Sequence, residues 1–232
     1  MNSGKFKAPW LSISDMMTGL MMIFLFISVS YSHQVSQESE EVIEKQDDIE
    51  EIVRELIDHR LLISQALHNE FDEDLEEWNA TIVDETLTFR FESPEVLFRA
   101  GEANVSPLFE NIISDFWPRY LQILNSHNMV ISEIKIEGHT SSEWSGTSSR
   151  DDSYFNNMKL SQDRSRNVLY SCYQNTPENL REWVISNITA TGFSFSRLKY
   201  SEGKEDPDAS RRVEFTIVID TEQSITEITE TF

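Results

Sequence analysis

The first long hydrophobic pattern runs from residue 11 to residue 31, twenty-one residues that contain a single charge, Asp15. At about 1.5 Å of rise per residue, a helix of this length spans roughly the 30 Å hydrocarbon core of a bilayer. We therefore predict one transmembrane helix over residues 11–31. Lys5 and Lys7 precede the span and acidic residues follow it, so residues 1–10 are expected in the cytoplasm and the rest of the chain in the periplasm.

The single acid in this span needs an explanation. A carboxylate within an apolar helix costs roughly 2.5–3.5 kcal/mol on insertion scales, so Asp15 is expected to face protein or a water-filled path. Two other interpretations stay open at this stage. Asp15 caps the start of the helix, or the run is a cleaved secretory signal, against which its length and its acid both argue.

A second pattern follows the span, because residues 35–78 contain sixteen Asp or Glu against three Lys or Arg. Apolar residues recur there every seven positions, and β-branched residues at the leading position favour two parallel strands. We predict an acidic helical linker over residues 32–80 that pairs with a second copy as a coiled coil. The alternative is a single helix that lies on its own globular domain. The repeated residues are Val35, Val42, Ile49, Leu56 and Ile63.

Residues 81–220 alternate between strand-like and helix-like patterns, which predicts an α+β domain with helices on one face of a small sheet. Residues 221–232 are expected to form a C-terminal tail. The predicted strands cover residues 85–91, 131–137, 188–191 and 213–219, and the predicted helices cover residues 107–124, 160–173 and 177–187. Pro118 is expected to interrupt or kink the first of these helices.

Composition narrows the function classes. A formal net charge of -22 argues against nucleic acid and against anionic lipid headgroups as partners, and leaves protein, cell wall or cations. Cys172 is the only cysteine, so no intrachain disulfide forms, although a bond between two copies stays open. Nothing in the sequence has the spacing of metal ligands, and no cofactor is expected.

The apolar span resembles a known family. Its Asp-x-Met-Thr-x-x-Met pattern and the following Phe/Leu run are similar to the membrane helix of the MotB family of stator subunits. Within that family, the residue sequence of the span is most similar to the MotB-like subunits of Zorya anti-phage defence systems. The resemblance implies that Asp15 carries a proton or a sodium ion, that Thr18 lies beside the ion path, and that a homodimer stands inside a ring of MotA-like (ZorA-type) subunits in the bacterial inner membrane. The matching residues are Asp15, Met17, Thr18, Met21, Phe24 and Leu25.

Three motifs in the globular part resemble a second family in their order and spacing. They are Glu-Gly-His-Thr at residues 137–140, Asn-x-x-Leu-Ser-x-x-Arg at residues 157–164, and Ser-Arg-Arg-Val-Glu at residues 210–214. Together they are similar to the OmpA-like peptidoglycan-binding domain. The resemblance implies that Arg164 holds the carboxylate of diaminopimelate in a wall stem peptide, to which a planar guanidinium is well suited. The other implied binding residues are Asn157, Leu160, Thr140, Ser141 and Arg211.

One departure from that pattern matters. The family has an aspartate after Gly-His-Thr, which binds the ligand's ammonium group, whereas this chain has Ser141. Glu143, Asp151 or Asp152 are alternative sources of the missing charge. A domain that keeps the fold and has lost the ligand also stays open, as does a purely structural role for the two arginines at residues 211 and 212 on an acidic surface.

Taken together, these patterns predict a stator subunit of an ion-driven rotary membrane motor, with protons as the favoured ion, that is anchored to peptidoglycan and serves anti-phage defence. The alternatives are a flagellar-type stator subunit and a passive membrane-tethered wall anchor, and the acid in the span argues against the anchor. No enzymatic activity is expected, since no motif places a base and an orienting group beside a nucleophile. His139 is therefore interpreted as a structural histidine rather than as a catalytic partner of Cys172 or Ser141.

Overall fold

The computed structural model describes residues 9–92, 94–146 and 149–219. Lys5 and Lys7 of the predicted cytoplasmic segment, and the predicted tail at residues 221–232, lie outside the described residues. The chain divides into two compact units, Met1–Arg54 and Glu55–Phe232.

The first unit consists of the greater part of helix α1 (Pro9–Phe71), which is 63 residues long in all. Within the part of the chain that the structure describes, Ser14–Ser39 is the one helical segment long and apolar enough to cross a membrane. This segment overlaps the predicted span at residues 11–31. Its large apolar side chains are exposed in the single chain, as expected of a surface that lipid or a partner covers.

The second unit is built on a five-stranded sheet in the order β1 (Ala80–Val83), β2 (Thr88–Phe91), β7 (Val213–Ile219), β3 (Ile131–Gly138) and β4 (Ile188–Gly192). Strands β3 and β4 are parallel, and the other neighbouring pairs are antiparallel. Parallel neighbours require a long crossover connection, which helix α5 (Arg150–Gln174) supplies here. A separate ribbon pairs β5 (Tyr200–Ser201) with β6 (Lys204–Glu205).

The remaining helices are short except for α4, and side-chain caps mark where α4 and α7 begin. Ser106 caps α4 by accepting a hydrogen bond from the amide of Phe109, with Pro107 at the first helical position. The bounds are α2 (Leu75–Trp78), α3 (Pro94–Leu97), α4 (Pro107–Ser126), α6 (Arg181–Asn187) and α7 (Pro207–Ser210), with 3-10 turns at Asp84–Thr86 and Glu178–Leu180.

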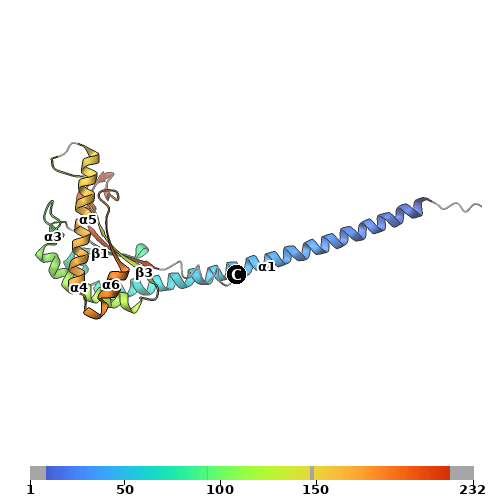
Figure 1. Cartoon of the computed structure of the whole chain (residues 1–232), viewed down its shortest axis with the longest axis horizontal. Helices are drawn as coiled ribbons and strands as arrows, with labels where there is room; N and C mark the ends of the chain where they lie inside the picture. Colours follow the sequence, from blue (N-terminus) through green and yellow to red (C-terminus); the bar gives the residue numbers. More distant parts are fainter. Residues whose placement is uncertain (1–8, 93, 147–148, 220–232) are drawn as a thin grey trace, which may run out of the picture. The chain divides into compact units, whose positions relative to one another are not determined.

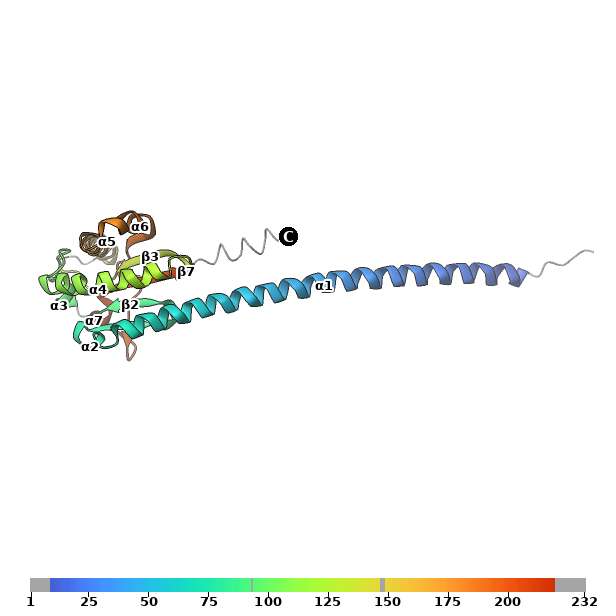
Figure 2. The same cartoon turned by 90° about the horizontal axis from the view of Figure 1, so that it is seen from below.

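One face of the sheet carries the core. Phe89 and Phe91 on β2 are buried, and alternation along a strand turns Arg90 between them to the opposite face. Helix α4 lies between α5 and the last turns of α1, as Figure 2 shows. The ring centres of Phe116 on α4 and Phe71 on α1 are 5.3 Å apart. The predicted α+β arrangement with helices on one face is therefore confirmed (Figure 1).

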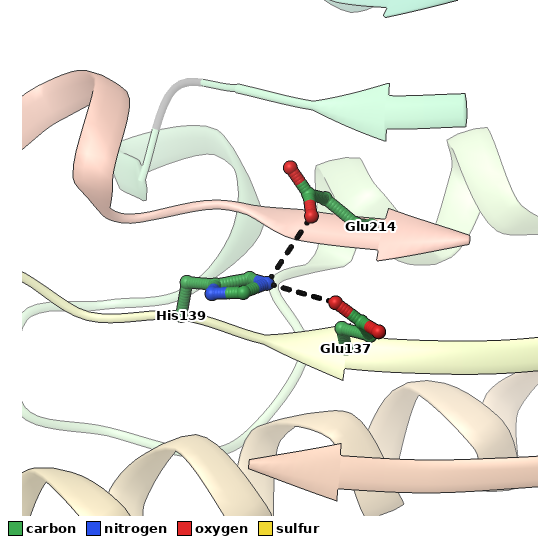
Figure 3. Close-up of side chains that lie close together, drawn as sticks. All are labelled: Glu137, His139 and Glu214. Atoms are coloured by element: carbon green, nitrogen blue, oxygen red, sulfur yellow. Dashed lines mark ion pairs between the residues drawn. The ribbon is translucent and has the colours of Figure 1, made fainter. Parts of the chain in front are cut away.

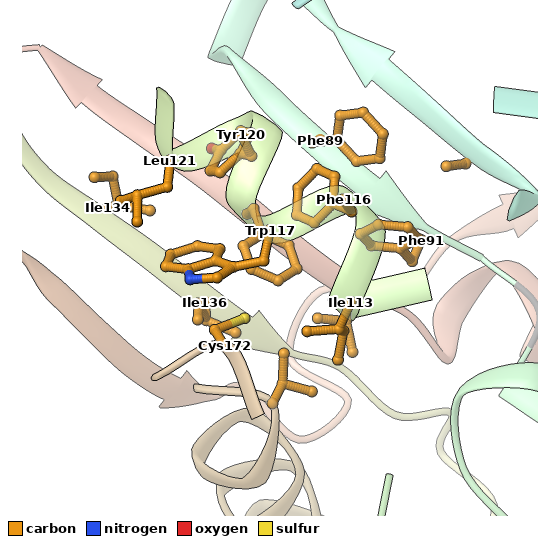
Figure 4. Packing of buried hydrophobic residues seen from close by; sticks show 14 of the residues in the cluster. Phe89, Phe91, Ile113, Phe116, Trp117, Tyr120, Leu121, Ile134, Ile136 and Cys172 are labelled. Atoms are coloured by element: carbon orange, nitrogen blue, oxygen red, sulfur yellow. The ribbon is translucent and has the colours of Figure 1, made fainter. Parts of the chain in front are cut away.

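Ten of the 28 described residues buried in the core are aromatic, and α4 contributes the largest side chains to it (Figure 4). The Phe116 ring packs on the Phe89 ring with ring centres 4.7 Å apart and stacks on the Tyr120 ring with ring centres 4.8 Å apart. The Cys172 thiol is completely buried beneath these rings, and this burial raises its pKa. A disulfide between two copies through Cys172 is therefore excluded in the folded domain.

The end of α1 belongs to this core. Ile63, Leu67 and Phe71 follow one another at helical spacing and are fully buried against the sheet and α4. Burial of each such side chain stabilises a fold by roughly 1.5–3 kcal/mol. The last heptad position, Ile63, is thus occupied by the chain's own domain and is not available to a second copy, whereas Val42 and Ile49 are exposed.

Several element boundaries differ from the sequence patterns. Helix α1 ends at Phe71 and strand β1 begins at Ala80, where a continuous linker helix was expected. Helix α5 begins at Arg150, ten residues before the predicted start, because polar residues in its first turns hide the apolar periodicity while Ser149 supplies a cap. The helix at α4 continues through Pro118 to Ser126.

Polar contacts hold the last turns of α1 on the domain. The His68 imidazole lies 2.6 Å from the Asp72 carboxylate and 3.0 Å from that of Asp84, and the Ser64 hydroxyl also donates to Asp84 at 2.5 Å. On the other side, the Arg119 guanidinium donates to Glu70 at 2.7 Å. Hydrogen bonding to Asp72, and further to Asp84, raises the pKa of His68 above its usual value despite partial burial.

This imidazole makes stability depend on pH. A raised pKa in the folded state means that the contribution of His68 is fully present below its unfolded pKa of 6.5 and is lost as pH rises through the folded value. We therefore expect His68→Gln to destabilise a fragment that begins at Glu55 more at pH 5.5 than at pH 8.5, as measured by urea unfolding. An equal destabilisation at both pH values would contradict the ion-pair assignment.

Candidate functional site

Asp15 lies well inside α1. The helix begins at Pro9, six residues earlier, so Asp15 is not the N-terminal cap, and that interpretation is excluded. Thr18 follows on the same face and donates its hydroxyl proton to the Ser14 carbonyl at 2.8 Å. The span therefore presents a short polar stripe of Ser14, Asp15 and Thr18 on an otherwise apolar helix.

The second candidate site is a cavity of about 370 Å³ between the start of α5 and the segments around it. It gathers side chains from four separate parts of the chain, and a volume of this size is typical of ligand sites. All six residues that the OmpA-like resemblance implied line this one cavity: Arg164, Asn157, Leu160, Thr140, Ser141 and Arg211. No sequence periodicity brings these residues together, only the fold.

Arg164 places a buried positive charge in the wall of the cavity. It is only 6% exposed, and its guanidinium donates to the Glu102 carbonyl at 2.9 Å and to the Arg99 carbonyl at 3.4 Å. Its guanidinium carbon lies 4.7 Å from the ring centre of Phe98. No carboxylate of residues 9–92, 94–146 or 149–219 forms an ion pair with it. A buried cation without an anionic partner is costly, which favours a site for a bound anion.

Arg164 remains positively charged at neutral pH. Burial lowers its pKa, the nearby Arg211 guanidinium lowers it further, and together they bring it to about 10. At pH 7 the side chain is therefore a positive, planar donor that faces the cavity. Such a group is suited to a carboxylate, which it contacts through two parallel hydrogen bonds.

Close packing positions Arg164. A Cβ atom at Gly138 would lie 2.4 Å from the Ser161 carbonyl oxygen, and one at Gly192 would lie 2.3 Å from the Gln162 amide nitrogen. The glycines at the ends of β3 and β4 thus allow the α5 backbone to lie directly on the sheet. Ser161 adds a hydrogen bond at this contact by accepting from the Ser194 amide at 2.9 Å. Arg164 follows Ser161 by one turn and is aimed into the cavity.

The loop after β3 forms the cavity rim. The Asn157 side chain is buried and donates to the Glu143 carbonyl at 3.3 Å, which fixes this loop on α5. Glu143 is the one acid among the residues that line the cavity, and its carboxylate lies 3.5 Å from Arg211. Asp151 instead lines a neighbouring hollow. Of the three acids considered as substitutes for the missing aspartate, Glu143 is therefore the one whose position fits.

The two consecutive arginines have different surroundings. Arg211 reaches the cavity rim and pairs with Asp208 at 2.5 Å. Arg212 is buried behind it, donates to Glu214 at 2.7 Å, and so belongs to an ionic cluster on the far face of the sheet. The structural role considered for both arginines fits Arg212 better than Arg211.

His139 lies in the middle of that ionic cluster. Its imidazole is 3.4 Å from Glu137 and 3.3 Å from Glu214 (Figure 3), and it stacks on Phe193. Burial raises the pKa of Glu214, but the adjacent His139 imidazole and the charge of Arg212 outweigh this effect and hold it well below its usual range.

Sequence spacing did not reveal that Glu137, His139 and Glu214 meet, with ligand atoms within 4.8 Å of one another as in some metal sites. Both carboxylates are already paired, since Arg90 donates to Glu214 at 2.6 Å and Arg197 to Glu137 at 2.8 Å. The cluster is thus a neutralised salt-bridge network, which fits the structural role expected of His139. Sequence reasoning also missed Phe98 and Trp144 as cavity residues.

Known proteins resemble this chain in fold and in sequence. No family model matches the sequence. A MotB-like protein from Desulfovibrio vulgaris shares the fold, with 23% identity, a TM-score of 0.53, and coverage of 72% of this chain and 98% of that chain. The periplasmic domain of Helicobacter pylori MotB aligns with 14% identity over 66% of this chain and 89% of that chain, at a TM-score of 0.45.

A relative of known family shares nearly the whole length of the chain. The Zorya protein ZorB of Escherichia coli is 43% identical over 221 residues, which are 94% of this chain and 91% of ZorB. Identity at this level over almost the full length of both proteins extends through the apolar helix as well as the globular unit. The protein belongs to the family of the Zorya protein ZorB.

Proposed function

We propose that this protein is the stator subunit of an ion-driven rotary membrane motor, that its globular unit holds peptidoglycan, and that the motor serves anti-phage defence. The observation that carries the anchoring part is the buried Arg164 guanidinium, which lines a cavity and has no carboxylate partner among the described residues. Membership of the ZorB family supports the defence setting. The role is mechanical rather than enzymatic.

The anchoring proposal assigns chemistry to the cavity. Arg164 binds a carboxylate of the diaminopimelate residue of a stem peptide, and Leu160 and Phe98 contact its aliphatic chain. Thr140 has a buried hydroxyl without a hydrogen-bond partner in the described part of the chain, and a ligand group satisfies it. Asn157 keeps the rim in place through the Glu143 carbonyl.

The test uses the full-length protein in detergent micelles and insoluble peptidoglycan. We expect the protein to sediment with the polymer and to be released by the free tripeptide L-Ala-γ-D-Glu-diaminopimelate. The same tripeptide with its carboxylates converted to amides should not release it, because a neutral amide brings no negative charge to the guanidinium and only one acceptor oxygen. Absence of sedimentation, or equal release by both peptides, would exclude the proposed ligand.

Glu143 is proposed to take the place of the family's aspartate. It is exposed, it lines the cavity, and its own contact with Arg211 is long at 3.5 Å, so it is available to an ammonium group. We expect Glu143→Gln to weaken tripeptide binding by up to about fivefold, since an exposed charge pair contributes roughly 0.2–1 kcal/mol. Titration calorimetry measures this change.

A compensating variant controls for this assignment. Ser141→Asp restores the family's usual residue, so it should recover the affinity that Glu143→Gln loses. A tripeptide whose side-chain amine is acetylated should bind the parent and Glu143→Gln equally. If the acetylated peptide also distinguishes the two proteins, Glu143 acts on something other than the ammonium group.

The ion-carrying part rests on Asp15. We propose that two copies present Asp15 and Thr18 inside a ring of MotA-like (ZorA-type) subunits, and that protonation and release at Asp15 bias rotation of the ring. The globular unit, held by the wall in the periplasm, then prevents the dimer from turning with the ring. A passive anchor is the second candidate function, and it has no use for an acid in its span.

Dimerisation through α1 is part of the proposal. The exposed heptad positions Val35, Val42 and Ile49 form the seam, and the coil ends before Ile63 because that residue is buried in its own domain. We expect Val42→Asp to raise the dissociation constant of the soluble fragment that begins at residue 34 by at least tenfold, or about 1.4 kcal/mol. Analytical ultracentrifugation gives this constant.

The neighbouring residue supplies the matched control. Ile43 is also β-branched and exposed, but it lies off the heptad seam, so Ile43→Asp should leave the dimer intact. A parent fragment that stays monomeric at high protein and salt concentration would rule out the coil. Equal weakening by both substitutions would place the contact on another face of α1.

A further inference from the structure

A second hollow lies beside the proposed stem-peptide cavity, between the first turns of α5 and the segment that follows β4. It measures about 620 Å³, and a neighbouring hollow of about 400 Å³ shares Arg150, Phe195, Leu198 and Tyr200 with it. We call the two together the aromatic groove. Its defining residues are Arg150, Tyr154, Phe155, Phe195 and Tyr200.

Ring contacts and a hydrogen bond hold the floor of the aromatic groove together. Phe195 is 7% exposed and forms a T-shaped ring pair with Tyr154, with ring centres 5.3 Å apart. The Arg150 guanidinium carbon lies 5.9 Å from the centre of the Phe195 ring. The Ser194 hydroxyl donates to the Tyr154 carbonyl at 2.8 Å and so ties the segment after β4 to α5. The two walls therefore do not separate without breaking these contacts.

The sides of the aromatic groove carry exposed rings. Phe155 is 70% exposed and Tyr200 is 66% exposed, although each is large enough to contribute strongly to a core. A single exposed aromatic residue is ordinary, but two that line one hollow mark a binding surface. Polar groups stand beside the rings, among them Ser196, Arg197 and Asp151.

We propose that the aromatic groove binds the glycan strand of peptidoglycan while the neighbouring cavity holds the stem peptide. This inference rests on the proposed wall-anchoring function. A pyranose ring has apolar C–H faces and a rim of hydroxyl groups, so it is suited to aromatic platforms flanked by hydrogen-bonding side chains. The groove offers both kinds of group on the same surface.

The position of the groove favours this occupant over others. Ser141 and Glu143 line the stem-peptide cavity, whereas Ser142 between them lines the aromatic groove. The two sites are thus separated by the thickness of one chain segment. Because stem peptides are covalently attached to the sugar strand, a peptide held on one side of this segment brings its glycan close to the other side. A net charge of -22 disfavours nucleic acid, the other polymer that stacks on aromatic rings.

The test separates the two sites with two probes and the full-length protein in detergent micelles. One probe is glycan strands from which an amidase has removed the stem peptides, and the other is the free tripeptide. We expect Phe155→Ala and Tyr200→Ala each to reduce glycan affinity by about tenfold, through lost ring contact, and to leave tripeptide affinity unchanged. Arg164→Ala should reduce tripeptide affinity and leave glycan affinity unchanged.

Tyr170 provides the matched control, since it is similarly exposed on α5 but lies outside the groove, and Tyr170→Ala should bind both probes as the parent does. Unchanged tripeptide binding in the groove variants also shows that they are folded. If the parent binds the tripeptide but not the stripped glycan, the inference fails and the anchoring function stands. If the groove variants bind glycan normally yet lose phage protection, the groove serves a protein partner and the inference is overturned.

Discussion

Asp15→Asn is expected to abolish protection against phage while the protein still assembles in the membrane. Asparagine is nearly the same size and keeps an oxygen that accepts hydrogen bonds, but it cannot take up and release a proton. A motor that uses this carboxylate as its ion carrier therefore stops completely. Asp15→Glu should retain some activity because it still ionises. Plaque counts on cells with matched amounts of parent and variant protein measure the effect.

The position of Asp15 makes this result informative. It lies six residues into α1, so a loss of activity cannot be attributed to a lost helix cap. Copurification of the variant with its membrane partner controls for assembly. Full protection by Asp15→Asn at normal protein levels would exclude ion transfer through this residue, and the passive anchor would become the better account.

Arg164→Ala is expected to weaken stem-peptide binding by about 10- to 150-fold. Hydrogen bonds that involve a charged group contribute roughly 1.5–3 kcal/mol, and this guanidinium is the buried cation of the cavity. The fold should persist, because the substitution removes a buried charge that has no carboxylate partner within the described residues. Calorimetry with the free tripeptide, and circular dichroism of the same samples, measure the two quantities.

Arg166 is the matched control for this substitution. It lies on the same helix two residues later, is exposed, and does not line the cavity, so Arg166→Ala should bind the tripeptide as the parent does. Arg164→Lys keeps the charge without the planar fork and should recover only part of the affinity. Equal binding by Arg164→Ala and the parent would remove the proposed site.

The candidate site was predictable from the sequence to the extent that its motifs are local. Gly138, Asn157, Ser161 and Arg164 stand at spacings that a strand end and a helix impose, so a resemblance in spacing carried over to positions in space. The contributions of Phe98 and Trp144 were not predictable, because apolar residues in loops have no periodic pattern to mark them. Their role follows only from the folded chain bringing them over Arg164.

The heptad pattern shows the limit of periodicity more sharply. Val42, Ile49 and Ile63 belong to one repeat in the sequence, yet Val42 and Ile49 are exposed while Ile63 is fully buried in its own domain. An apolar residue at a regular spacing requires a partner surface, but the spacing does not say whether that surface belongs to the same chain or to another. Only the packing of Phe71 against Phe89 and Phe116 shows where the free helix ends.

The sequence by itself determined the helix that is long and apolar enough to cross a membrane, the acid within it, the α+β class and the motif residues around Arg164, because length, hydrophobicity and local spacing are properties of contiguous segments. The tertiary structure alone decided that Glu143 lines the cavity, that Glu137, His139 and Glu214 meet, and that Phe155 and Tyr200 flank one groove. These neighbours come from strands, loops and helix α5, and most of them lie far apart in the chain. Their meeting depends on strand order and on which face of the sheet each residue takes, and no local pattern encodes either.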